Sequence, residues 1–301
     1  MSRRLISLMA ALMFASSASA AAAAAVNTDC VIEMDSSAPQ WRIDDIDVFS
    51  QQTRVASFQL HLINSGNGQC MIHLGFDTAG SPFGLLGPSA KRVPYQIIDH
   101  DSGKDLTPNK GNLSSNYPGV IKIGAQSTVT LNIDFVVFPE LDADGEYTQS
   151  LMISADGNGN NDVHTARTQT LVATAASSAT MSLNGSFTRT GGIADIDLGV
   201  LQGQGPVALP LFLKVRSTRA YRIRSTSQNN GKLLLSGTAW SIPYRMTING
   251  TEINPAGGEY LSTSGLYRRL DTMPLGFNIV GSTDVEAGRY SDLVTLEISL
   301  N

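Results

Sequence analysis

The stretch IDDIDV at residues 43–48 returns as IADIDL at residues 193–198, and this repeat decides the fold. Two further blocks repeat in the same order, namely VPYQI at 93–97 as IPYRM at 242–246 and GEYTQ at 145–149 as GRYSD at 288–292. The offsets between the paired blocks are 150, 149 and 143 residues, so the two halves are collinear with small insertions. Self-similarity of this kind identifies the repeating structural unit. The sequence therefore predicts two related domains in tandem.

Each half contains short segments in which apolar and polar residues alternate. The clearest are SFQLHL at 57–62, VTLNIDF at 129–135 and VTLEISL at 294–300. This period of two places one side of a strand on a core and the other in water. Turn-forming Gly, Asn and Asp separate these segments, and no stretch repeats with the period of a helix. Over about 130 residues per unit, the pattern predicts an all-β fold of two tandem immunoglobulin-like β-sandwich domains.

The first residues have the features of a secretory signal peptide. Arg3 and Arg4 precede an apolar run at 5–14, and the small residues ASA follow at 18–20. The apolar run is shorter than the ~20 residues that span a bilayer, and no later run reaches that length. We therefore expect an exported chain. The predicted divisions are residues 1–25 for the signal peptide, 26–175 for the N-terminal β-sandwich domain and 176–301 for the C-terminal β-sandwich domain.

Cys30 and Cys70 are the only cysteines in the chain. Export sends them to an oxidising compartment, where disulfides form and persist. We therefore predict a single disulfide between them, inside the N-terminal domain. Two free buried thiols are the alternative.

The two halves differ after the third repeated block. The first half continues through TARTQTLVAT at 165–174, which is rich in β-branched residues and is predicted to form one more strand. The second half has only the strand at 294–300 before the sequence ends at Asn301. If the halves share a fold, the C-terminal domain lacks its final strand and exposes a sheet edge that a strand from a partner chain would complete. The alternative is that residues 156–175 are a linker and both domains are complete.

The segment EAGRYSDLVTLEI at 286–298 resembles the C-terminal signature of the spore-coat-protein-U-like pilin family, whose members end in an alternating strand after an Ala-Gly-x-Tyr-x-Asp motif. The segment IDLG at 196–199 is similar to an early element of the same family. This family builds archaic chaperone-usher pili. The resemblance implies a pilin domain that lacks its final strand and is held by a periplasmic pilus chaperone. It also implies export through an outer-membrane usher and a donor strand supplied by the next pilus subunit.

The resemblance further implies roles for particular residues of the C-terminal domain. The acceptor groove for the donor strand would be bordered by Met181, Leu183, Val294, Leu296, Ile298 and Leu300. The carboxylate of Asn301 would anchor the domain in the basic cleft of the chaperone. The alternative is that the apolar residues belong to the ordinary core beneath an edge strand. Many members of the family carry a disulfide in this domain, whereas the second half of this chain has no cysteine.

A subunit in the shaft of such a fibre also donates a strand, from an N-terminal extension of ~10–15 residues with alternating bulky apolar side chains. Here residues 21–29 are mostly alanine, and Val26 is their one sizeable apolar residue. A chain that accepts a strand but does not donate one is predicted to lie at the pilus tip. We therefore expect a tip adhesin, exported through the periplasm to the cell surface, that attaches to an abiotic or host surface and supports biofilm formation. A secreted β-sandwich module that binds a ligand such as a carbohydrate, without a fibre, is the alternative.

Two segments of the N-terminal domain are candidates for contact with a surface. SPFGLLGP at 81–88 mixes turn formers with apolar residues, and NLSSNYPGV at 112–120 lies where the first half is longer than the second. Loops longer than a shared scaffold needs are where function concentrates. Leu85 and Leu86 align with leucines of the second half, so we expect both in the core. Packing of these segments on their own domain is the alternative. The predicted contact residues are Phe83, Leu113, Tyr117 and Val120.

The sequence contains no catalytic or metal-binding pattern. It lacks Gly-x-Ser-x-Gly, His-Glu-x-x-His and P-loop motifs. The segment DGNGNND at 156–162 alternates oxygen ligands but lacks the Gly and Glu of a calcium loop, so we predict a polar turn. The net charge of −5 gives no basic footprint for nucleic acid. We expect no enzyme activity, cofactor, metal or nucleic-acid partner, with an enzyme of unrecognised type as the alternative. The histidines, which show no ligand spacing, are His61, His73, His100 and His164.

Overall fold

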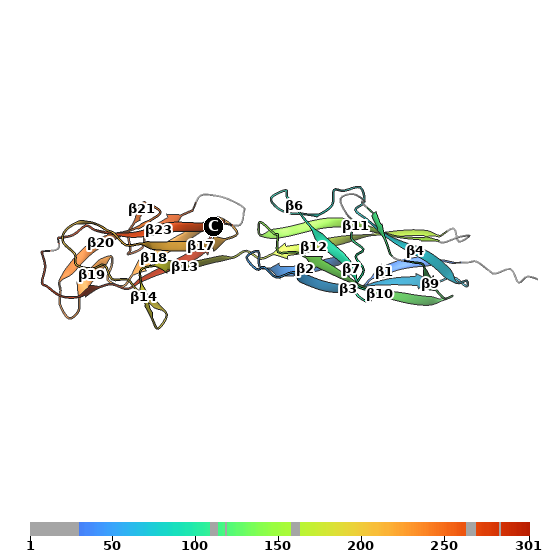
Figure 1. Cartoon of the computed structure of the whole chain (residues 1–301), viewed down its shortest axis with the longest axis horizontal. Coiled ribbons are helices and arrows are strands. Elements are labelled where there is room, and N and C mark those ends of the chain that lie inside the picture. Colours follow the sequence, from blue (N-terminus) through green and yellow to red (C-terminus); the bar gives the residue numbers. More distant parts are fainter. Residues whose placement is uncertain (1–29, 109–113, 118, 158–162, 263–268, 283) are drawn as a thin grey trace, which may run out of the picture.

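The computed structural model describes residues 30–108, 114–117, 119–157, 163–262, 269–282 and 284–301. The predicted signal peptide and Leu113 lie outside the described residues. The secondary structure consists of β-strands, which Figure 1 shows in two bodies that lie end to end. Within the described residues no helix has the length and apolarity needed to cross a membrane. The fold is therefore all-β with two sandwich domains, as the repeat predicts.

The first domain is a sandwich of two sheets. One sheet has the strand order β1-β3-β10-β7, and the other has β2-β12-β11-β4-β8 with three short strands attached. The strands in chain order are β1 (Ile32–Ser36), β2 (Gln40–Ile46), β3 (Arg54–Asn64), β4 (Cys70–Asp77), β5 (Leu85–Leu86), β6 (Arg92–Val93), β7 (Tyr95–Asp99), β8 (Ser114–Asn116), β9 (Ile121–Ile123), β10 (Ser127–Val137), β11 (Gly145–Gly157) and β12 (His164–Ala175).

Alternating side chains of both sheets fill the core of the first domain. Trp41 is fully buried and stacks on Phe58, with ring centroids 5.6 Å apart. The predicted disulfide is present and joins Cys30, just before β1, to Cys70 at the start of β4. The two Cα atoms lie 5.2 Å apart. Because β1 belongs to one sheet and β4 to the other, the bridge ties the two sheets together at one end of the sandwich.

Leu85 and Leu86 do not both enter the core. Leu85 is fully buried, whereas Leu86 is 42% exposed. The two residues are neighbours in β5, and successive side chains of a strand point to opposite faces. The prediction of core packing was therefore wrong for Leu86.

The second domain repeats the sandwich with a smaller second sheet. The larger sheet has the order β13-β17-β23-β20-β19-β24, the smaller has β22-β18-β25, and β14 and β15 form a separate hairpin. The strands are β13 (Ala179–Gly185), β14 (Thr188–Thr190), β15 (Ile193–Asp195), β16 (Gly205–Val207), β17 (Leu211–Ser217), β18 (Tyr221–Ser227), β19 (Lys232–Leu235), β20 (Ser241–Ile248), β21 (Thr251–Ile253), β22 (Glu259–Leu261), β23 (Arg269–Ile279), β24 (Tyr290–Ser291) and β25 (Val294–Leu300).

The third repeated block forms the same hydrogen bond in both domains. The hydroxyl of Tyr147 donates to the carbonyl oxygen of Ala143 at 2.9 Å, and that of Tyr290 donates to the carbonyl oxygen of Glu286 at 2.7 Å. Two residues before Tyr290, a Cβ at Gly288 would lie 2.4 Å from a terminal methyl of Leu235, so a larger residue there would displace that side chain. The sequence repeat is therefore also a repeat of local structure.

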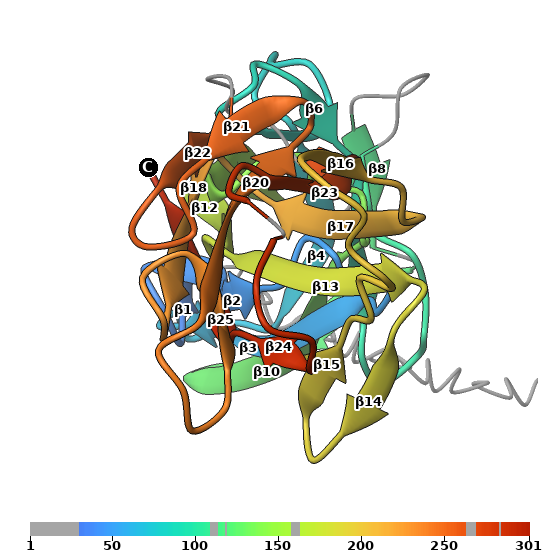
Figure 2. The same cartoon turned by 90° about the vertical axis from the view of Figure 1, so that its left-hand side faces the viewer.

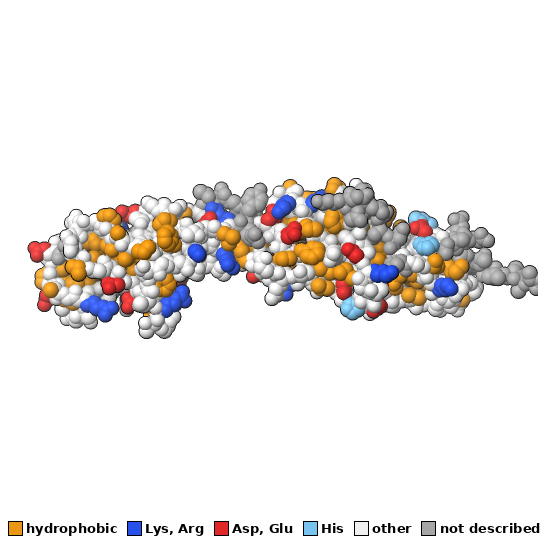
Figure 3. All heavy atoms as spheres, in the orientation of Figure 1, with side chains coloured by type: hydrophobic (Ala, Val, Ile, Leu, Met, Phe, Trp, Pro, Cys, Tyr) orange, Lys and Arg blue, Asp and Glu red, His pale blue; other side chains and the backbone are white. Residues whose placement is uncertain are grey.

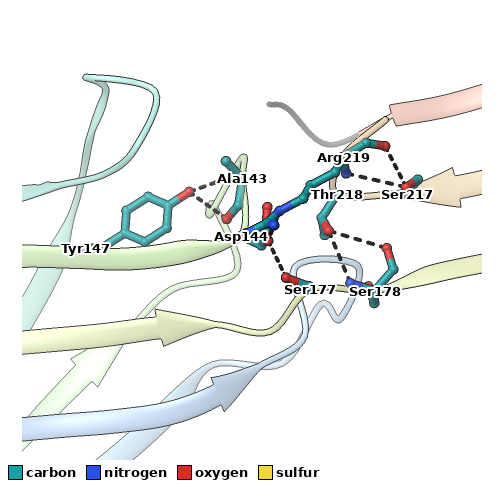
Figure 4. A network of polar contacts seen from close by, with 8 residues as sticks. All are labelled: Ala143, Asp144, Tyr147, Ser177, Ser178, Ser217, Thr218 and Arg219. Atoms are coloured by element: carbon teal, nitrogen blue, oxygen red, sulfur yellow. Dashed lines mark hydrogen bonds and ion pairs between the residues drawn. The ribbon is translucent and has the colours of Figure 1, made fainter. Parts of the chain in front are cut away.

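A polar network joins the two domains (Figure 4). Asp144, buried in the loop before β11, accepts a hydrogen bond from Ser177 Oγ and pairs with Arg219, whose Nε lies 2.5 Å from Asp144 Oδ2. The backbone N–H of Thr218 donates to the carbonyl oxygen of Ser178 at 3.0 Å, and the Ser178 N–H donates to Thr218 Oγ1 at 3.1 Å. The connection between β12 and β13 is thereby tied to both domains.

The two domains point the same way along the molecule. β12 ends at Ala175, beside the connection to β13, so the antiparallel β11 begins there and runs away from the second domain. β25 ends next to the C-terminus, which Figure 1 marks at the end of the second domain that faces the first. β25 runs toward the first domain and β11 runs away from the second, so these two matched strands run in the same direction along the long axis.

Candidate functional site

β25 is paired along one edge. It lies antiparallel to β18, in a register that runs from Val294 opposite Ser227 to Leu300 opposite Tyr221. Among the residues that the structure describes, no strand pairs with the second edge of β25. Unpaired N–H and C=O groups along a strand are a template for another strand. This edge is therefore the candidate functional site.

The first domain shows what occupies the equivalent position. Its β11 is the counterpart of β25 and pairs with β4 on one side and with β12 on the other. β12 in turn pairs in parallel with β2. No counterpart of β12 is present in the described part of the second domain. The vacant position thus lies between β25 and the segment that matches β2.

The apolar side chains of β25 are less buried than their counterparts in β11, as expected for a strand that lacks one neighbour. Leu151 and Ile153 of β11 are fully buried. Their counterparts in β25, Val294 and Leu296, are only half-buried, although the alternation with exposed residues such as Thr295 is retained. A strand against β25 would cover these apolar side chains, as β12 covers those of β11.

The six residues predicted to border an acceptor groove lie on two neighbouring strands. β13 and β25 lie next to each other, and their apolar side chains are all half-buried. We call these six side chains and the free backbone of β25 the open edge. Their role in binding a donor strand stays a prediction. The residues are Met181 and Leu183 of β13 and Val294, Leu296, Ile298 and Leu300 of β25.

The segment that matches β2 is not part of either sandwich sheet in the second domain. Ile43 and Ile46 of β2 are buried in the first domain. Ile193, the counterpart of Ile43, is 55% exposed and belongs to the hairpin β14–β15, which projects from the body of the domain in Figure 2. Similar residues therefore take two structures. Among the described strands, β12 of the first domain pairs with β2, and no strand of the second domain takes this place beside residues 193–198.

Asp292 fixes the start of β25. Its Oδ2 accepts hydrogen bonds from the hydroxyls of Tyr244 at 2.7 Å and Ser227 at 2.6 Å, and its Oδ1 accepts one from the N–H of Asn229 at 3.0 Å. Burial, and then the bond to Asp292, raises the pKa of Tyr244 above its usual value. These bonds join the chain before β25 to β18 and β20, so the open edge has a fixed position.

The sequence shows Asp292 as the last residue of the Ala-Gly-x-Tyr-x-Asp motif, but it does not predict that this carboxylate accepts hydrogen bonds from Tyr244 and Ser227. Tyr244 lies in the second repeated block and Asp292 in the third. The first domain has Tyr95 and Gln149 at these positions, so a carboxylate opposite the tyrosine is particular to the second domain. That contrast between the two copies is the signal that would have found the pair.

Asn301 follows β25 and is exposed. Its backbone N–H donates to the carbonyl oxygen of Ala220 at 2.9 Å. This bond extends the pairing between β25 and β18 by one residue, so Asn301 is held against the sheet. Contact between its carboxylate and a chaperone stays a prediction.

The residues predicted to meet a surface lie on the first domain, and two of them pack against its core. Phe83 has its ring centroid 4.9 Å from that of Tyr95 and lines a hollow of about 410 Å³. The hydroxyl of Tyr117 donates to Asp99 Oδ2 at 3.1 Å. Phe83 and Tyr117 are partly buried against the core, while Val120 is 36% exposed. Their role in surface contact stays a prediction.

A scan against protein-family models finds no match, and no curated protein matches the sequence. A solved structure with a similar fold is the CsuC–CsuE chaperone–tip adhesion subunit pre-assembly complex from archaic chaperone-usher Csu pili of Acinetobacter baumannii. The identity is 12%, the match covers 87% of this chain and 97% of that chain, and the TM-score is 0.48. The CupB6 tip adhesin from Pseudomonas aeruginosa is 11% identical over 89% of this chain and 93% of that chain, with a TM-score of 0.41. Both TM-scores lie below 0.5, so neither match supports an argument about function.

Proposed function

We propose that this chain is the tip adhesin subunit of an archaic chaperone-usher pilus of the spore-coat-protein-U-like type. Its second domain is completed by a donor strand from the next subunit. A single contrast supports this proposal: β12 lies between β11 and β2, and the equivalent position beside β25 holds no described strand. A periplasmic chaperone covers the open edge before assembly, and an outer-membrane usher exports the subunit.

The first domain provides a template for how the donor strand lies. The donor is antiparallel to β25 and parallel to residues 193–198, as β12 is to β11 and β2. Since β25 ends on the side that faces the first domain, the donor begins there and leaves at the opposite end of the second domain (Figure 1). The next subunit follows at that end. The first domain is then at the free end of the fibre, where an adhesin meets its target.

The donor's inward side chains differ from those of β12. Opposite the buried Ile153, β12 presents Arg167. The counterpart of Ile153 is Leu296, which is apolar and half-buried. Removing apolar surface from water is favourable by about 25 cal/mol per Å², and it requires an apolar neighbour. We therefore expect alternating apolar residues in the donor, which the alanine-rich residues 21–29 of this chain do not supply.

The test of this function is the position of the subunit in a fibre. The chain is expressed with the chaperone, usher and other subunits of its own cell, and an antibody against the first domain is followed by electron microscopy. We expect one label at the end of each fibre. Label along the shaft would contradict the tip position. A folded, protease-resistant chain that never joins a fibre would contradict the whole proposal and favour a secreted binding module.

A further inference from the structure

Three neighbouring strands of the first domain place His73, Asp156 and His164 in one row. Asp156 of β11 is directly opposite His164 of β12 in one pairing and directly opposite His73 of β4 in the other. Neighbouring strands lie about 4.8 Å apart, so the row spans about 10 Å across the sheet. The two histidines lie 83 and 8 residues away from Asp156 along the sequence, which is why spacing in the sequence does not reveal the row.

The three side chains share the outer face of the sheet. His73, Asp156 and His164 are exposed, whereas their neighbours Leu74 and Ala155 are buried in the core. Figure 3 shows histidine side chains on either side of an acidic side chain on the first domain, toward the end that lies away from the second domain. The row is therefore open to solvent and to a partner from outside.

The contacts within the row leave ligating atoms available. His164 Nδ1 lies 2.5 Å from Asp156 Oδ1, and Ser154 Oγ lies 3.4 Å from Asp156 Oδ2. Among the described residues, no hydrogen bond or ion pair is made by the imidazole of His73. One imidazole already contacts the carboxylate, and the second is free to turn toward it.

We propose that His73, Asp156 and His164 form a binding site for a divalent transition metal ion such as Zn²⁺. Two imidazoles and a carboxylate are the protein ligands that Zn²⁺ takes, with water in the fourth position. As the side chains stand, no three of the His, Cys, Asp and Glu residues that the structure describes are placed to hold a metal ion together, and His164 Nδ1 contacts Asp156 Oδ1. We expect rotation of the two exposed imidazoles about their side-chain bonds to bring both rings over Asp156, because the three residues are direct neighbours across the strands.

The chain contains a matched pair that lacks the second imidazole. His100 Nδ1 lies 2.9 Å from Asp134 Oδ2, and the residues opposite Asp134 are Ser57 and Ile98. This pair has the same histidine–carboxylate contact without a three-ligand row. A metal that binds any exposed His–Asp pair would bind both places, whereas the proposed site predicts binding at the row alone.

The test is titration of the full chain, prepared without a histidine tag, with ZnCl₂ by calorimetry. We expect one saturable site per chain, weakened at least ~10-fold by His73→Gln or His164→Gln and unchanged by His100→Gln. Asp156→Asn removes the charge of the central ligand at nearly constant size and should also weaken Zn²⁺ binding. Circular dichroism checks that each variant is folded. Absence of saturable binding, or equal affinity in wild type, H73Q and H164Q, would overturn the proposal. The row lies on the first domain and the open edge on the second. Whether or not Zn²⁺ binds, the result therefore does not bear on the proposal that a donor strand completes the second domain.

Discussion

Tyr147 and Tyr290 occupy the same position of the repeat in different surroundings. Tyr147 lies opposite Ala173 of β12 and is fully buried, whereas Tyr290 is half-buried. The aligned blocks predict that the two tyrosines are equivalent. They do not predict the difference in burial, because that depends on a neighbouring strand present in one domain.

The hydroxyl of Tyr147 is needed for the stability of the first domain. It accepts hydrogen bonds from the N–H groups of Asp142 and Ala143 at 3.2 and 2.8 Å. Tyr147→Phe leaves buried polar groups without a partner, which costs about 1–3 kcal/mol of unfolding free energy. We expect this loss in urea unfolding followed by Trp41 fluorescence in a Trp240→Phe background. Tyr290→Phe is the matched variant, followed by Trp240 fluorescence in a Trp41→Phe background, and its expected loss is smaller. Equal losses would contradict this account of the repeat.

The buried tyrosines predict a loss of stability at alkaline pH. Burial raises the pKa of Tyr147 to about 12, and it also raises the pKa values of Tyr95, Tyr221 and Tyr244. The unfolded chain loses its phenolic protons near pH 10, while the folded chain keeps them. The contribution of these groups to the free energy of unfolding is therefore constant below about pH 10 and falls as the pH rises from there toward about 12. Urea unfolding at stepped pH measures the slope, which Tyr147→Phe should reduce.

At the scale of elements, the alternation of apolar and polar residues predicted where the strands lie. Which strands pair depends on whether a neighbouring strand is present. The segments at 57–62, 129–135 and 294–300 lie within β3, β10 and β25. The predicted extra strand at 165–174 lies within β12. The repeat at 193–198 did not form the strand pairing of 43–48, because strand formation depends on a neighbour as well as on local residues. The sequence therefore predicts the elements better than their partners.

Along β25, inward and outward residues should differ in their effect on strand binding. Leu296→Asn places an amide where an apolar contact is needed. It should weaken binding of a synthetic alternating-apolar donor peptide by ~30-fold or more, equivalent to about 2 kcal/mol. Thr295→Asn changes the exposed face of the same strand and should change binding by less than about 0.5 kcal/mol. Fluorescence anisotropy of the labelled peptide measures both. Equal weakening by the two variants would show that the peptide does not bind through the open edge.

At the scale of the whole molecule, the joint between the domains depends on contacts that the sequence does not reveal. Asp144 and Arg219 lie 75 residues apart, and Asp144 has Ala287 as its counterpart in the second repeat. The order of the repeats predicts two domains in line. It does not predict which loop residues fix their relative orientation.

Loss of the Asp144–Arg219 pair should loosen this joint. Asp144→Ala removes a buried carboxylate that bonds both Arg219 and Ser177. We expect a broader distribution of distances between spin labels placed on the two domains, measured by pulsed electron paramagnetic resonance. A double-mutant cycle of Asp144→Ala and Arg219→Ala, measured by urea unfolding, should give a coupling of roughly 1 kcal/mol in the free energy of unfolding. The value is small because Arg219 is half-exposed. Arg245→Ala, which removes an ion pair within the second domain, is the control and should leave the distribution unchanged.

The open edge of β25 can be tested with the chain's own hairpin. Asn301 aligns with Asn158 at the offset of 143, so a copy of residues 159–175 appended after Asn301 continues the chain as β11 continues into β12. In one version of this tail, the inward positions copied from Thr165, Arg167 and Gln169 are changed to Val. In the control version they are left polar.

Hydrogen–deuterium exchange of the peptide at residues 294–300 is the most direct measurement. The account predicts that the apolar tail slows exchange of these amides markedly relative to the chain without a tail, and that the polar control slows it less. The amides of β25 that bond β18 exchange slowly in either case. Slow exchange of all the amides of this peptide without a tail, or no change with the apolar tail, would contradict the central claim that β25 awaits a strand from a partner.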